Sequence, residues 1–91
     1  MSDTETALHS LTARAMLDVV DDVSSRRGVT RQELLGRSRT RAVVAARQEL
    51  WWLIRHHPGR CYSYAEIAAT VGRDSSTVVH GIAAHDRRHA P

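Results

Sequence analysis

The segment from Ala65 to Ile82 constrains the fold most, because its pattern fits two short helices joined by a tight turn. Gly72 lies between the two halves, and glycine adopts the left-handed backbone conformation that such a turn requires. Four apolar residues flank the turn at helical spacing: Ile67, Val71, Val78 and Ile82. They would form a wedge that fixes the crossing angle, while Ala68 or Ala69 lets the helices approach closely. The pattern predicts a helix-turn-helix.

The second of these helices begins with polar and mostly short residues: Arg73, Asp74, Ser75, Ser76 and Thr77. Side chains of this kind at a helix start can enter the major groove of duplex DNA and contact base edges. Asp74 is also well suited to cap the helix. The same pattern occurs in helical hairpins that bind no nucleic acid. The segment therefore favours DNA binding without excluding a purely structural hairpin.

The rest of the chain is also expected to be helical. An apolar stripe predicts a first helix over about residues 4–27, which Gly28 would end. Thr30 and Glu33 form a capping box for a short helix over residues 31–35. A third helix is expected from about residue 41 to 56, where His56-His57-Pro58-Gly59 would stop it.

The last two helices are those of the helix-turn-helix, over about residues 63–87. Ser63 and Glu66 form a second capping box there. No alternating apolar run or hairpin turn indicates a strand. The 91 residues are enough for one domain. We expect a single all-α domain of five helices, one of them short, that contains the helix-turn-helix.

Composition limits the possible functions. The single cysteine, Cys61, excludes an internal disulfide, and no signal peptide or apolar run of membrane-spanning length is visible. We expect a soluble, cytoplasmic protein. No phosphate-binding loop motif is present, so neither a nucleotide nor another cofactor is expected. His85 and His89 have the spacing of metal ligands but lie near the chain end, so no metal site is expected either.

Charge is distributed unevenly along the chain. The net charge is only +3, yet residues 1–22 carry five acids and one base, whereas arginine predominates from Arg26 onward. The segment over residues 36–41 is a basic loop in which Arg37, Arg39 and Arg41 alternate with small residues. Such a loop can follow phosphates or place an arginine in a minor groove. The alternative is an ordinary solvated loop.

Two runs of residues resemble one known family. The first run resembles the opening of the C-terminal DNA-binding domain of the bacterial replication initiator DnaA. It consists of Leu34-Leu35, the basic loop, the helix start Ala42-Val43-Val44 and the pair Arg47-Gln48. The run Gly72-Arg73-Asp74-Ser75-Ser76-Thr77-Val78-Val79-His80 resembles that family's signature, Gly-Arg-Asp-His-Thr-Thr-Val-Leu-His. The resemblance implies the helical fold of that domain, which is also similar to the Trp repressor.

The resemblance also implies roles for individual residues. Arg39 stands where the family inserts an arginine into the minor groove. The major-groove positions are taken by Arg73, Asp74, Ser75, Ser76 and Thr77. Arg47 and Gln48 match a pair that contacts the phosphate backbone and supports the site. His80 is expected either near the DNA backbone or as a hydrogen-bonded histidine in a helix interface, and Arg37 and Arg41 belong to the phosphate-following loop.

Departures from the family pattern affect what the chain can do. Ser75 and Ser76 replace a histidine and a threonine, which reduces apolar contact with thymine methyl groups. Ala45 and Ala46 replace a basic residue and a proline, so one phosphate contact is missing. The ATPase module of the initiator is absent from this sequence. From the Met1 start and the acidic first helix we expect an independent protein, such as a phage-derived regulator, or the N-terminal domain of a larger regulator.

The sequence as a whole predicts site-specific binding to double-stranded DNA in transcription or replication control. A competing hypothesis is a protein-interaction module that contacts a polymerase or an initiator through the acidic first helix, where Asp18, Asp21 and Asp22 would face outward. An enzyme is not expected, because no nucleophile and base have suitable spacing.

Overall fold

Five helices and no strand make up the parts of the chain that the computed structural model describes, residues 11–58 and 62–89. They are α2 (Leu11–Arg27), α3 (Arg31–Leu35), α4 (Arg41–Arg55), α5 (Tyr64–Val71) and α6 (Ser75–His89). The all-α prediction, including the short helix, is confirmed. The predicted start of the first helix near Thr4 lies outside the described residues, as does Cys61. No helix among the described residues is long and apolar enough to cross a membrane.

Two capping boxes determine where α3 and α5 begin. The Thr30 hydroxyl accepts a hydrogen bond from the Glu33 N–H at 3.0 Å, and the Glu33 carboxylate accepts one from the Thr30 N–H at 2.9 Å. This N–H lowers the pKa of Glu33 because it stabilises the charged carboxylate. Ser63 and Glu66 repeat the arrangement at α5, at 3.1 and 3.2 Å. Both predicted caps are confirmed.

Two glycines end helices in the left-handed conformation, as their positions predicted. Gly28 (φ 65°) follows α2, and Gly72 (φ 69°) follows α5. At the second turn the N–H of Arg73 donates to the carbonyl of Ala68 at 2.9 Å, which reverses the chain toward α6. A residue with a Cβ would be strained at either glycine.

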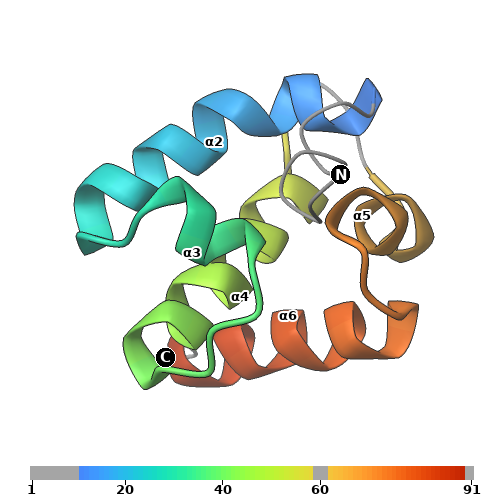
Figure 1. Ribbon diagram of the computed structural model, residues 1–91. Helices are drawn as coiled ribbons and strands as arrows, with labels where there is room; N and C mark the ends of the chain where they lie inside the picture. The colour runs from blue at the N-terminus through green and yellow to red at the C-terminus, as the bar shows by residue number, and fades with distance from the viewer. Residues whose placement is uncertain (1–10, 59–61, 90–91) are drawn as a thin grey trace.

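Helix α4 lies at the centre of the packing and contacts all four other helices (Figure 1). Its apolar face contributes Val43, Ala46, Leu50, Trp51 and Ile54 to the core. The other core residues come from every remaining helix and from the segments next to them: Val20, Val23, Val29, Leu34, Leu35, Tyr62, Ile67, Ala68, Val71, Val78 and Ile82. The core therefore joins the helix-turn-helix to the rest of the domain in one cluster.

The closest approach of α6 to α4 depends on Gly81. A Cβ atom built there would lie 2.6 Å from two ring carbons of Trp51 and 3.3 Å from the Gln48 side chain. Because Trp51 is only 4% exposed, its ring has little room to move. The sequence pattern did not single out this glycine, since a glycine inside a helix has no local signature for close packing.

His85 is the buried titratable group of α6. Its ring lies 5.3 Å from the Trp52 ring and 4.3 Å from the His89 ring, centroid to centroid, and its Nδ1 has no hydrogen-bond partner among the described residues. Burial, with the nearby His89, lowers the pKa of His85. The indole N–H of Trp52 donates to Asp86 at 2.7 Å, so the ring that covers His85 is itself attached to α6.

We predict that Gly81→Ala destabilises the domain by about 1–3 kcal/mol, the usual cost of overpacking. An ordinary glycine-to-alanine change within a helix would instead stabilise it. Urea denaturation followed by tryptophan fluorescence measures the difference. Ser76→Ala, at an exposed position of the same helix, is the control and should change stability by less than about 0.5 kcal/mol. A Gly81→Ala variant at least as stable as the parent would contradict the close contact.

We predict that the free energy of unfolding falls as the pH drops below about 6.5, the ordinary pKa of histidine. In the unfolded chain His85 takes up a proton there, whereas burial lowers its pKa in the folded domain, so acid favours the unfolded state. Urea titrations between pH 7.5 and 5 check this. The dependence should weaken in His85→Leu and persist in His80→Ala, which alters an exposed ring.

Candidate nucleic-acid interface

The helix-turn-helix consists of α5, the turn at residues 72–74 and α6. Its four wedge residues are at most 5% exposed: Ile67, Val71, Val78 and Ile82. Ala68, rather than Ala69, is the small buried residue of α5. The carbonyl of Asp74 accepts from the N–H of Val78, which places Asp74 at the cap of α6. The side chains at positions 74–77 and 80 are all exposed, so the predicted contact residues lie on the surface.

Two Gly-Arg pairs connect the basic loop to this turn. The Arg37 guanidinium donates to the carbonyl of Gly72 at 3.2 Å, and the Arg73 guanidinium donates to the carbonyl of Gly36. Each arginine thus reaches the glycine that precedes the other arginine. The two segments are 35 residues or more apart in sequence. This exchange fixes the loop relative to the start of α6, which the sequence alone did not predict.

Arg47 holds the same loop from the inside. Only 6% exposed, it donates from Nε to the carbonyl of Leu34 at 3.1 Å, from Nη1 to that of Ser38 at 3.0 Å and from Nη2 to that of Glu33 at 2.8 Å. Burial, together with the neighbouring Arg73 and Arg37 charges, lowers its pKa. The family resemblance implied phosphate contact and support for the Arg47–Gln48 pair; in this structure Arg47 provides the support.

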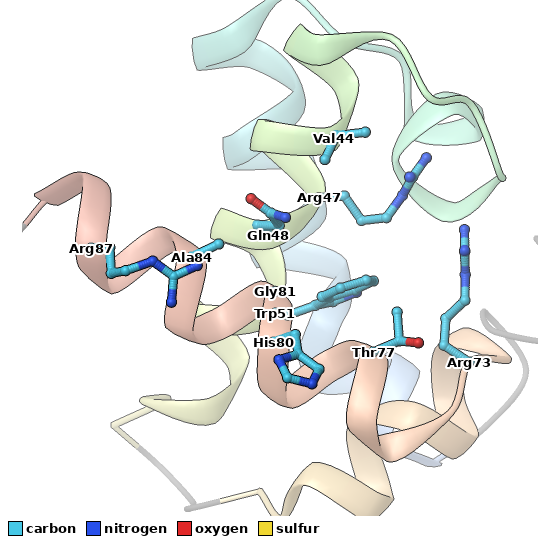
Figure 2. Close-up of a pocket in the computed structure, with 10 residues that line it drawn as sticks. All are labelled: Val44, Arg47, Gln48, Trp51, Arg73, Thr77, His80, Gly81, Ala84 and Arg87. Carbon is cyan, nitrogen blue, oxygen red and sulfur yellow. The ribbon is translucent and has the colours of Figure 1, made fainter.

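A groove runs along the seam between α4 and α6. Figure 2 shows one part of it, lined by Val44, Arg47, Gln48, Trp51, Arg73, Thr77, His80, Gly81, Ala84 and Arg87. A second hollow shares Val44 and Gln48 with the first and is also lined by Arg39, Arg41, Ala45 and Arg88. We call the two together the α4–α6 groove. In Figure 2 the side chains of Arg47 and Arg73 both extend toward the segment of α3 and the basic loop whose carbonyls they bind.

The groove brings together most of the residues that the sequence singled out. Seven of them line it: Arg39, Arg41, Arg47, Gln48, Arg73, Thr77 and His80. Asp74, Ser75 and Ser76 lie next to it, at the exposed start of α6. Arg37 lies in the loop that borders it and is exposed. The structure thus assembles one continuous surface from segments of the chain that are far apart in sequence.

Several acidic side chains pair with arginines away from the groove. Asp22 and Glu49 pair with Arg26, and Glu49 also pairs with Arg27, on the surface that α2 and α4 share. Arg31 pairs with an exposed residue of α2, Asp21. Among the described residues, none with a carboxylate lines the α4–α6 groove. The α4–α6 groove is therefore strongly positive although the net charge of the chain is small.

Two charged groove residues were missed by the sequence analysis, Arg87 and Arg88. The Arg88 guanidinium donates to the Gln48 side-chain carbonyl at 2.6 Å and so connects the end of α6 to α4. Their spacing from His80 and Thr77 was a usable signal, because Arg87 follows His80 by seven residues and Arg88 follows Thr77 by eleven.

The described residues contain no group of three or more histidine, cysteine, aspartate or glutamate side chains that could hold a metal ion.

Comparison with known proteins agrees with this geometry. The model of the family described as the helix-turn-helix of the bacterial DnaA protein matches residues 16–84. The chain belongs to this family. It is 33% identical over 64 residues to the chromosomal replication initiator protein DnaA of Kosmotoga olearia, a match that covers 70% of this chain and 14% of that protein. No solved structure matches the chain significantly.

We predict that Arg47→Met destabilises the domain by about 3 kcal/mol, because three carbonyl groups lose a charged donor at a poorly hydrated place. Arg47→Lys should recover only part of the loss, since an ammonium group lacks the planar fork that reaches three acceptors. Urea denaturation measures both. Arg41→Met, at an exposed groove position, is the matched control. A stability of Arg47→Met equal to that of the control would refute this role.

Proposed function

We propose that this domain binds double-stranded DNA in a sequence-specific manner and acts in the control of replication or transcription. One observation carries the proposal: the arginine-lined α4–α6 groove continues into the exposed polar start of a helix-turn-helix. Arginine side chains bind phosphates, and the start of the second helix is the part of this motif that contacts bases. Membership of the DnaA helix-turn-helix family supports the same conclusion.

We assign two contact regions. The start of α6, with Asp74, Ser75 and Ser76, enters the major groove. Arg39 enters the adjacent minor groove from the basic loop. A protein that contacts two grooves at once needs a rigid connection between the contacting segments, since mobility there would lower affinity. The exchange between the Gly36-Arg37 and Gly72-Arg73 pairs supplies such a connection.

The connecting arginines also bring positive charge to the interface. Their hydrogen bonds to the carbonyl oxygens of Gly36 and Gly72 orient the Arg37 and Arg73 guanidinium groups. Both groups also lie close enough to Arg47 to lower its pKa by repulsion. Three positive charges held together in this way attract the phosphate backbone of DNA.

We further propose that the preferred DNA sequence differs from the box that chromosomal initiators bind. Ser75 and Ser76 stand where the family has histidine and threonine. A serine hydroxyl can exchange hydrogen bonds with several base edges but offers no methyl group to a thymine. Selection of bound duplexes from a random pool identifies the preferred sequence. Recovery of the initiator box itself would refute this part of the proposal.

We predict that Arg39→Ala weakens binding to the selected duplex at least tenfold, because it removes a charged contact from the narrow minor groove. Asp74→Ala or Ser75→Ala should instead lower discrimination at individual base pairs by about 1–3 kcal/mol each. Fluorescence anisotropy titrations measure both effects. Arg31→Ala is the control, because Arg31 pairs with Asp21 away from the groove. If Arg39→Ala and Arg73→Ala both bind as the parent does, the assigned interface is wrong.

A further inference from the structure

The face of α6 that carries Thr77 and His80 does not end at these residues. Arg87 follows His80 by seven residues, which brings it to within about 20° of the same side of the helix and about 10 Å further along the axis. Arg88 follows Thr77 by eleven residues and is equally well aligned. All four residues line the α4–α6 groove. The surface thus extends over three turns beyond the start of the helix.

Small residues line this stretch of α6. Gly81 and Ala84 are the groove residues of α6 between His80 and Arg87. The Trp51 ring of α4 packs directly against Gly81, and Ala84 presents only a methyl group, so neither residue extends a side chain over the groove. In Figure 2 the side chain of Arg87 extends along α6 toward Ala84 and not away from the groove. A ligand lying in the groove would therefore meet the Arg87 guanidinium.

At the far end of the groove, Arg88 acts together with α4. Its hydrogen bond to the side-chain carbonyl of Gln48 leaves the amide N–H₂ of Gln48 as the group available to a ligand. Arg39 and Arg41 of the basic loop line the same hollow. In the described residues that line this end, the charged side chains are all arginines. Such a set of donors suits a chain of phosphates.

Basic residues in the last turn of a helix also interact favourably with the helix dipole. The dipole explains why the last turn contains basic residues such as Arg87 and Arg88. It does not explain on which side of the helix they lie, because its effect is the same on every side. It explains neither their alignment with Thr77 and His80 nor the bond to Gln48. Their position in the groove requires a further reason.

We propose that Arg87 and Arg88 extend the DNA interface by binding the phosphate backbone of the strand that lies along the α4–α6 groove. Arg88 in addition positions the Gln48 amide as a phosphate donor. This inference rests on the proposed function and adds contacts beyond the start of α6 and the basic loop. Phosphate contacts raise affinity for every sequence alike, so these two arginines contribute affinity and not sequence preference.

The test compares Arg87→Gln, Arg88→Gln and the double variant with the parent and with Arg31→Gln. Dissociation constants for the selected duplex and for a random duplex are measured at several salt concentrations. The slope of log K against log salt should become shallower by about 0.9 for each groove arginine and by about 1.8 for the double variant. The ratio of specific to random affinity should not change. The control should retain the parent slope.

A second set of variants separates charge from folding. Arg87→Lys with Arg88→Lys keeps both charges and should keep the parent slope, while thermal denaturation confirms that each variant is folded. Unchanged slopes in the glutamine variants, or equal losses in the lysine and glutamine variants, would overturn the inference. If Arg39→Ala still weakens binding in that case, the proposed function survives without this extension. A parent protein that binds no duplex overturns both.

Discussion

The buried guanidinium of Arg47 is the interaction on which the functional surface depends. Its three N–H groups bind carbonyls from the end of α3 and from the basic loop, and its helix packs against every other helix. A loop of alternating arginines and small polar residues has no apolar side chain to anchor it. A charged donor from the centre of the fold provides that anchor, and the Gly-Arg exchange then aligns the loop with the helix-turn-helix.

The distribution of charge shows why composition is a weak guide to binding. A net charge of +3 on 91 residues is unremarkable. The fold pairs Asp21, Asp22 and Glu49 with arginines away from the α4–α6 groove, so that these opposite charges cancel there. None of the described residues that line the groove carries a carboxylate. A surface with a strong field arises from a nearly balanced chain because folding separates the two signs.

Local structure was predictable where it depends on neighbouring residues. The capping boxes at Thr30 and Ser63 and the left-handed Gly28 and Gly72 follow from contacts within a few residues, and all are present. The helix-turn-helix wedge follows from apolar residues at helical spacing on both sides of one turn, and its residues are buried. Gly81 and Arg47 were different. Gly81 packs against Trp51 of another helix, and Arg47 binds three carbonyl groups outside its own helix. No short-range sequence pattern predicts such contacts. The sequence gives the residue type at both positions, but it does not give the residues that each one contacts.

The sequence by itself determined the elements found among the described residues: the helices and the caps that bound α3 and α5, a polar start to α6, and a loop rich in arginine. These follow from backbone preferences and from the periodicity of apolar residues, which act locally. Only the tertiary structure decided that the loop, α4 and the far end of α6 form one groove, and that Arg47 supports it from within. The reason is that charge and hydrogen bonding act through space, and the distances between these residues are set by the packing of the core.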